Sequence, residues 1–226
     1  GAVSFDQADP TNLGRYAVLN RAPEYHVADT DWGTMYAAYR PAEADSTYWR
    51  VAHFMFPFWT IPPDGAFADH IIARAWVPMD DTHTMFFHVS WKKNTPGLRK
   101  LKDGSQIPGA TIGNHYLPNT SDWHGRWRLA ANATNDYLID RDSQKNGSYS
   151  GIEGIHLQDQ ALTESMGEIV DHTFENLAGS DLMISRTRRR IVQAVRAAQG
   201  GNAAPGVDRP ETYQGARGGD FLSPPT

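Results

Sequence analysis

The pattern of hydrophobic and polar positions changes part-way along the chain. Before residue 92, aromatic and β-branched residues come in short runs bounded by Pro, Gly and Asp, which is typical of strands joined by turns. The runs predict six strands, at residues 15–19, 25–28, 33–39, 47–56, 70–77 and 84–91. Several short strands with short connections predict an antiparallel sheet.

The strand expected at residues 47–56 is apolar on both faces. Because side chains alternate along a strand, Tyr48, Arg50 and Phe54 share one face, while Val51 and His53 share the other. A strand without a clear water side fits a sheet covered by helices on one face and by a cavity or another subunit on the other. A central strand in an ordinary two-layer core would show the same pattern.

Two helices are expected in the second half of the chain. Residues 92–150 are polar and show no clear period, which favours a functional loop or cover over a plain linker. Residues 156–169 and 182–198 then carry apolar positions at helical spacing. Ser180 or Asp181 is the expected N-cap of the second helix, and Gly200 is expected to end it.

The second helix is expected to bury its apolar positions and to expose its arginines. The apolar positions are Leu182, Ile184, Ile191, Val192 and Val195; the arginines are Arg186, Arg188, Arg189 and Arg190. A docking patch for a partner is the alternative role of this charge run. Residues 201–226 are rich in Gly, Pro and Ala and are expected to wrap the surface, so we predict a domain over residues 1–200 followed by an extended tail over 201–226.

Composition excludes several functional classes. The 226 residues are 40% hydrophobic, enough for a core, and the net charge of -5 argues against a nucleic-acid or anionic-membrane partner. No apolar run approaches the roughly 20 residues of a membrane span, and a cytoplasmic location is expected. Cysteine is absent, so disulfides, zinc–thiolate sites and cysteine-ligated iron–sulfur clusters cannot form within this chain.

Candidate chemistry centres on the first predicted helix. His156 and Asp159 lie three residues apart and share a helix face, whereas Glu164 lies about 140° around the helix from Asp159. This spacing is compatible with an iron or zinc site, but a solvated polar face is the more typical interpretation. His83 and His88 are five residues apart in extended chain, so they point to opposite faces and are expected to be packing or surface residues.

Four segments resemble a known family. They are QDQALTESMG at residues 158–167, EIVDHTFENLAGSD at 168–181, VPMDDTH at 77–83 and YWRVAHFMFPF at 48–58. They are similar to the large subunit of Rieske non-heme iron aromatic ring-hydroxylating oxygenases, in the phthalate dioxygenase and aryl-ether O-demethylase branch. The resemblance covers roughly residues 30–200, and the run 157–181 is its most specific part.

The resemblance implies a fold and an iron ligand. The fold is α+β of the helix-grip, START-like type, an antiparallel sheet packed around a long C-terminal helix. Mononuclear Fe(II) is held in the family by two His and one carboxylate, and Asp159 stands at the carboxylate position. The family's Asn-x-x-Asp-x-x-His motif with a second His is absent, as are the Cys and His ligands of the Rieske [2Fe-2S] cluster. We therefore expect the C-terminal catalytic part of a longer subunit, starting just after the second His ligand and inactive alone.

The resemblance also implies a reaction and partners. O₂ and electrons from an NAD(P)H-dependent reductase would hydroxylate an aromatic compound, giving a cis-dihydrodiol or, from a methoxyl group, a phenol and formaldehyde. The full-length protein would be a homotrimer or a multiple of it. Arg50, His53 and Phe54 are candidates for the substrate pocket, because an arginine suits an aromatic carboxylate through bidentate pairing. Purely structural roles for these three residues are the alternative.

Two other functions remain open at this level. The same helix-grip cavity could hold an aromatic or lipid-like ligand without iron, or the chain could be an accessory subunit. The missing His pair favours these alternatives if the chain is complete in nature. The retained Asp159 and Glu164 pattern favours the oxygenase, because a cavity-only protein has no need of a helix carboxylate facing the sheet.

Overall fold

The computed structural model describes residues 3–43, 45–67, 71–91, 98–111 and 113–225. The chain forms two compact units, each described by itself below. The first contains residues 1–9 and 99–174, and the second contains residues 10–98 and 175–226. No helix among the described residues is both long enough and apolar enough to cross a bilayer.

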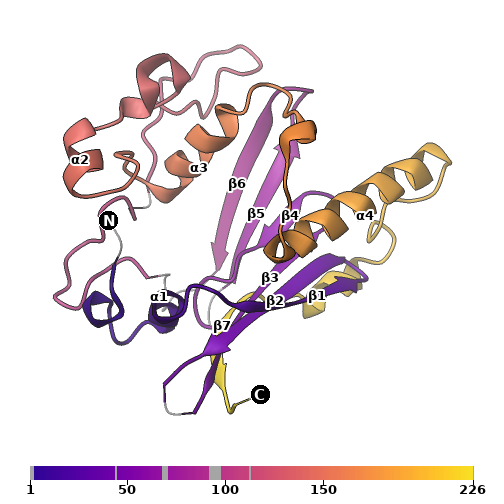
Figure 1. The fold of residues 1–226 in the computed structure, drawn as a ribbon. Helices are drawn as coiled ribbons and strands as arrows, with labels where there is room; N and C mark the ends of the chain where they lie inside the picture. Colours follow the sequence, from indigo (N-terminus) through magenta and orange to yellow (C-terminus); the bar gives the residue numbers. More distant parts are fainter. Residues whose placement is uncertain (1–2, 44, 68–70, 92–97, 112, 226) are drawn as a thin grey trace. The chain divides into compact units, whose positions relative to one another are not determined.

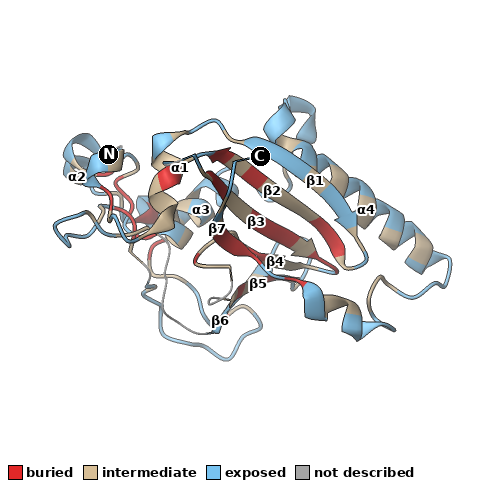
Figure 2. Cartoon of the chain, turned by 90° about the horizontal axis from the view of Figure 1, so that it is seen from below, coloured by how far each residue is buried: buried red, intermediate tan, exposed pale blue. Residues whose placement is uncertain are grey.

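The second unit is built on a seven-stranded antiparallel sheet (Figure 1). Its strands are β1 (Glu24–Thr30), β2 (Gly33–Pro41), β3 (Thr47–Met55), β4 (Trp59–Ile61), β5 (Ile71–Pro78), β6 (Thr84–Trp91) and β7 (Gly219–Ser223). Strands β1 to β6 are neighbours in sequence order, while β7 pairs with the first half of β3 and β4 pairs with its second half. Buried residues concentrate on β2 and β3 (Figure 2).

The long helix α4 (Leu182–Gln199) lies across β1 and β2 (Figure 1). Thr34 of β2 and Thr187 of α4 share a hydrogen bond of 2.5 Å between their hydroxyl oxygens, which identifies the sheet face that carries Thr34 as the α4 face. The expected α+β fold, with an antiparallel sheet and a long C-terminal helix, is confirmed. The chain turns tightly between β1 and β2, where a Cβ on Gly33 would come within 2.1 Å of the Phe54 carbonyl oxygen.

The first unit holds the short helices α2 (Arg141–Asn146) and α3 (Ile155–Glu164), together with the 3-10 helices η1 (Phe5–Gln7), η3 (Ala133–Leu138) and η4 (His172–Phe174). Asp140 caps α2 by accepting from the backbone N–H groups of Asp142 and Ser143. Tyr137 is buried in this unit, whereas Trp123 and Trp127 are exposed.

Most strand predictions and the second helix were correct, but two local predictions need correction. The helix expected at residues 156–169 ends at Glu164, and the segment at residues 15–19 is not a strand but the end of η2 (Leu13–Arg15) followed by α1 (Tyr16–Leu19). Asn12 starts this helical turn by accepting a hydrogen bond from the Gly14 backbone N–H at 2.8 Å, a local capping signal that overrides β propensity. His70, the first residue of another expected strand, lies outside the described residues. The remaining 3-10 helices are η5 (Gly179–Asp181) and η6 (Pro210–Gly215).

The expected orientation of α4 was wrong for two arginines and four apolar residues, whereas Arg188 and Arg189 are exposed as expected. Leu182, Ile184, Val192 and Val195 are 45–52% exposed, whereas Arg186 and Arg190 point toward the sheet. Arg186 donates to the Val27 carbonyl at 3.1 Å and Arg190 donates to the Thr30 carbonyl at 2.7 Å. The helix therefore meets β1 and its turn through carbonyl oxygens that need donors, which arginine supplies and valine cannot.

Two strands were not expected. Strand β4 is only three residues long, between Pro57 and Pro62, and such a short run has no readable period. Strand β7 lies within residues 201–226, which were expected to wrap the surface. Part of this segment instead joins the sheet by pairing with β3. Whether residues 1–200 form a domain without the tail stays a prediction.

Candidate functional site

The α4 face of the sheet carries a buried polar cluster. Strand alternation places Tyr36 and Arg40 of β2 and Tyr48, Arg50 and Phe54 of β3 on this face, because they share parity with Thr34 in the β2–β3 register. Asp220 joins them from β7, since its register partner in β3 is Arg50. Two consecutive strands and the distant β7 thus assemble one set of titratable side chains.

Tyr48 and Asp220 form the buried core of this cluster. Tyr48 is fully buried and donates its hydroxyl proton to Asp220 Oδ2 at 2.8 Å, and Asp220 is only 6% exposed. Burial raises the pKa of Asp220 above its ordinary value, an effect that the hydrogen bond from Tyr48 partly offsets. Burial also raises the pKa of Tyr48, and the neighbouring Asp220 charge adds to this rise. Tyr48 is therefore a neutral hydrogen-bond donor, and Asp220 holds its hydroxyl group in place.

Two arginines place positive charge on the same face. Arg40 is 6% exposed; it donates to the carbonyl oxygens of Ala17 and Asn20, and its Nε has no hydrogen-bond partner within the described part of the chain. Burial lowers the pKa of Arg40, and the nearby charge of Arg50 lowers it further. Arg50 uses its Nε on the Pro63 carbonyl at 3.2 Å, which leaves its terminal nitrogens without a hydrogen bond to any described residue.

Arg50 retains N–H donors on this face. Arg40 and Arg50 lie near the Asp220 carboxylate, Asp64 adds a second negative charge near Asp220, and a fork of N–H donors such as that of Arg50 matches a carboxylate in a bidentate pair. Tyr36 stands among them with a pKa raised by burial and lowered by Arg50, so it is a neutral hydroxyl at ordinary pH.

His53 lies on the other face of β3. Its Nδ1 accepts from Trp32 Nε1 at 3.2 Å, so the neutral ring carries its proton on Nε2 and donates it to the Arg217 carbonyl at 2.8 Å. The ring is 4% exposed, and burial lowers its pKa. Of the three residues expected to line a substrate pocket, Arg50 and Phe54 thus share a face and His53 belongs to the opposite one.

Asp159 is an available carboxylate on α3 of the first unit. Gln158 anchors this helix by donating to the carbonyl oxygens of Gly109 at 2.7 Å and Ile152 at 3.1 Å. Asp159, one residue further, is exposed, and its side chain has no hydrogen bond or ion pair with any residue in the described ranges. An unpartnered, accessible carboxylate fits one ligand position of an Fe(II) site, and the other positions require donors beyond this residue.

Glu164 is held differently from Asp159. Its Oε2 accepts from the Tyr137 hydroxyl at 2.5 Å and its Oε1 accepts from Gln160 Nε2 at 2.6 Å. Burial and the hydrogen bond to Glu164 raise the pKa of Tyr137 to about 12. Glu164 therefore ties η3 to α3, which is consistent with its placement away from Asp159 on the helix.

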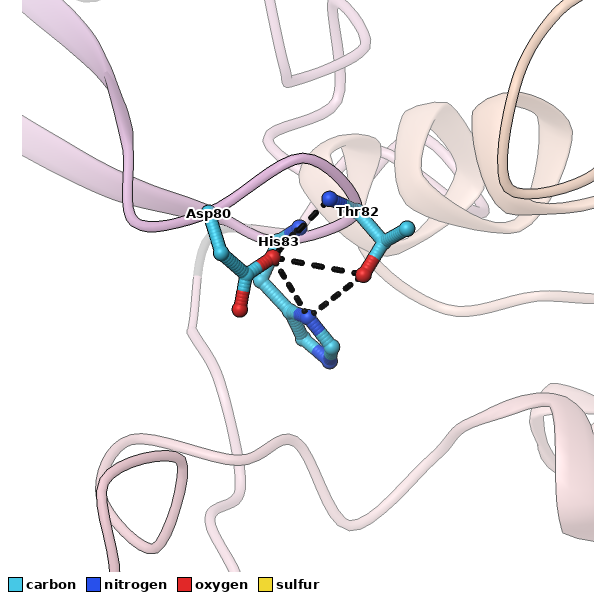
Figure 3. Close-up of polar contacts among 3 residues, drawn as sticks. All are labelled: Asp80, Thr82 and His83. Carbon is cyan, nitrogen blue, oxygen red and sulfur yellow. Dashed lines mark hydrogen bonds and ion pairs between the residues drawn. The ribbon is translucent and has the colours of Figure 1, made fainter.

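The turn between β5 and β6 is organised by Asp80 (Figure 3). Asp80 Oδ1 accepts from the backbone N–H groups of Thr82 at 2.9 Å and His83 at 2.7 Å, and it contacts His83 Nδ1 at 3.0 Å. These contacts close the hairpin between β5 and β6, so the polar residues of the 77–83 segment have a structural role in this turn. His88, on β6, is exposed.

Comparison with known proteins decides the family. The family model described as LigXa C-terminal domain like matches residues 3–216, nearly the whole chain. The chain belongs to this family. The resemblance to the C-terminal part of an oxygenase large subunit is thereby confirmed.

Two relatives of this LigXa C-terminal-domain-like chain are oxygenase subunits. The oxygenase subunit of 3-chlorobenzoate-3,4-dioxygenase from Comamonas testosteroni is 52% identical over 212 residues, which are 90% of this chain and 48% of the relative. The oxygenase subunit of phthalate 4,5-dioxygenase from Pseudomonas putida is 34% identical over 196 residues, which are 83% of this chain and 41% of the relative. The chain thus spans about half the length of the curated relatives it matches.

Sequence reasoning missed Arg40, Tyr48 and Asp220 as members of the cluster. Arg40 lies one residue beyond the strand predicted at residues 33–39, so it was not placed on a strand face. Asp220 had no usable signal, since its Gly-rich surroundings in the tail gave no sign that β7 would enter the sheet beside Arg50.

Proposed function

We propose that this chain is the C-terminal catalytic-domain part of a Rieske-type oxygenase that hydroxylates or O-demethylates a carboxylated aromatic compound. The observation that carries the proposal is the 52% identity to a chlorobenzoate dioxygenase oxygenase subunit across 90% of the chain. Both relatives are named for substrates that are aromatic carboxylates. O₂ and an NAD(P)H-dependent reductase are the proposed co-substrate and electron source, and a homotrimer or a multiple of it is the proposed assembly.

Asp159 is proposed as the carboxylate ligand of mononuclear Fe(II). The support for this assignment is the resemblance of residues 158–167 to the family's carboxylate segment; the exposure of Asp159 in this structure does not itself support it. The two His ligands and the Rieske [2Fe-2S] cluster are proposed to lie in a preceding part of the longer polypeptide. Fe(II), when bound, would supply dioxygen activation.

Arg50 is proposed to hold the substrate carboxylate. Its terminal nitrogens have no hydrogen bond to a described residue, and the additional positive charge of Arg40 and the apolar ring of Phe54 share its face. Arg50 would hold the substrate carboxylate by a charged contact, and Phe54 would pack against the aromatic ring, so that together they would orient the substrate. His53, held by two hydrogen bonds on the opposite face of β3, would stabilise the position of this strand.

The test is made in the complete oxygenase polypeptide that contains this chain, supplied with its reductase and 3-chlorobenzoate. We expect Asp159→Asn to lose most of the bound iron and all turnover, while the matched control Asp142→Asn, another exposed helix carboxylate, retains both. Arg50→Gln should keep iron and raise KM for the acid by about tenfold or more, the value of one charge-assisted pair. Iron retained in Asp159→Asn would refute the ligand assignment.

The reaction type needs a separate assay. A methoxybenzoate and a benzoate are given to the same preparation, and formaldehyde and ring diol are measured. Formaldehyde from the first compound with no diol from the second assigns O-demethylation. The reverse result assigns ring dihydroxylation.

A further inference from the structure

A concave site lies on the sheet face opposite α4. A pocket of about 420 Å³ lies there, lined by Trp32, Met35, Val51, His53, Phe67, Gly215, Arg217 and Phe221. Val51 and His53 of β3 alternate with Arg50 and Phe54, so the pocket and the Arg50 cluster lie on opposite faces of one strand. All eight residues belong to the second unit.

The wall of this pocket is apolar and aromatic. Trp32, Phe67 and Phe221 supply rings, and Met35 and Val51 supply aliphatic surface. His53 offers no free hydrogen-bonding nitrogen to a ligand, because Trp32 and the Arg217 carbonyl already bind both of its ring nitrogens. A flat, apolar group would therefore be accepted without leaving a buried polar atom unpaired.

Arg217 is the charged group of the pocket. One of its terminal nitrogens donates to the carbonyl oxygens of Gln214 and Ala216, which holds the side chain against its own loop. The guanidinium has no carboxylate partner in the described part of the chain, and none of the eight lining residues is acidic. Its remaining N–H donors are available to an anion at the rim.

We propose that this pocket is a second binding site, separate from the Arg50 face, for a small planar aromatic monoanion. The volume lies within the range of small-molecule sites, the rings match a flat ligand, and the single unpaired cation matches one negative group. The inference does not depend on iron, on the oxygenase reaction or on Asp159.

The experiment uses the full chain labelled with ¹⁵N and the indole N–H signal of Trp32, assigned with Trp32→Phe. Benzoate is the probe, and benzamide is its neutral counterpart of the same shape. We expect benzoate to move the Trp32 signal saturably, and we expect benzamide to bind about tenfold more weakly, because it lacks the charge that Arg217 recognises. Equal responses to the two probes would overturn the proposal.

Two variants test the pocket without disturbing the core. A Cβ on Gly215 would meet the Trp32 ring at an ordinary 3.9 Å, so Gly215→Leu should fill the pocket from its rim and abolish the benzoate response. Arg217→Gln should weaken benzoate about tenfold and leave benzamide unchanged, whereas Arg189→Gln, an exposed arginine of α4, should change neither. A response that persists in Gly215→Leu would contradict the assignment.

One further variant separates the two sites. Arg50→Gln should leave the Trp32 response intact. If instead it abolishes the response, benzoate binds only on the Arg50 face, and the second site is rejected while the proposed function stands. A Trp32 signal that moves with protein concentration alone would mean that a second copy of the chain fills the pocket, which also overturns the proposal.

Discussion

Trp32 Nε1 donates a hydrogen bond of 3.2 Å to His53 Nδ1, and this contact fixes the protonation state of a buried histidine. The opposite nitrogen donates to the Arg217 carbonyl at 2.8 Å, so His53 links the β1–β2 turn to the segment that leads into β7. The first hydrogen bond requires an accepting Nδ1 and is incompatible with an imidazolium, which only donates; the second requires a proton on Nε2. The neutral ring with its proton on Nε2 is the form that joins these elements.

Acidification should therefore destabilise the fold through His53. Its folded-state pKa is lowered from 6.5 by burial, so the unfolded chain takes up the proton first as the pH falls. The contribution of His53 to the free energy of unfolding is complete above about pH 6.5 and is lost as the pH falls from there toward the lower folded-state pKa. Urea unfolding between pH 5 and pH 8 measures this loss.

The control for that titration is His53→Gln, whose amide can accept from Trp32 and donate to the Arg217 carbonyl but cannot titrate in this range. The variant should show a smaller loss of stability on acidification than the parent chain, because eight other histidines remain in both. Identical pH profiles for the two chains would exclude His53 as a source of the acid sensitivity.

Removing the donor tests the same contact from the other side. Trp32→Phe keeps an aromatic ring but leaves His53 Nδ1 buried without a partner, which should lower the free energy of unfolding by about 1–3 kcal/mol. Trp123→Phe is the matched control, since Trp123 is 73% exposed and should change stability by less than about 0.5 kcal/mol. Equal effects would mean that the ring, and not the hydrogen bond, carries the stability.

The Tyr48–Asp220 pair makes a second stability prediction. Tyr48→Phe removes the donor that reaches Asp220 Oδ2 and leaves a buried carboxylate with less compensation, so we expect a loss of about 1–3 kcal/mol on chemical unfolding. Tyr149→Phe, at a residue that is 94% exposed, should have almost no effect. A neutral Tyr48→Phe would indicate that Asp220 finds its stabilisation elsewhere on the α4 face.

The position of α4 could be predicted from the sequence, but the side of the helix that meets the sheet could not. Helical period and the Gly200 stop were sufficient to place the helix, and strand alternation was sufficient to put Arg50 and Phe54 on one face. Which side of α4 meets the sheet could not be read, because Arg190 faces the Thr30 carbonyl while Val195 faces solvent. Hydrophobic period assumes apolar partners, and here the partners are backbone oxygens.

This correction has its own test. Arg190 donates to the carbonyl oxygens of Thr30 and Gly33 and lies over the Phe56 ring at 5.3 Å, so Arg190→Met should cost about 1.5–3 kcal/mol of stability. Arg189→Met, one residue away on the exposed side, should stay within about 0.5 kcal/mol of the parent. A solvated arginine face would instead give both variants the same small effect, and chemical unfolding distinguishes the two cases.

Iron binding by this chain alone should be weak. Asp159 is a single exposed carboxylate, and a site for Fe(II) of the facial-triad type needs two imidazole ligands as well. We expect titration of the isolated chain with Fe(II) under anaerobic conditions to give less than one equivalent retained after desalting, with no change in Asp159→Asn. Tight, stoichiometric iron that survives desalting would contradict this and would require another set of donors within the chain, with His156 the first residue to substitute.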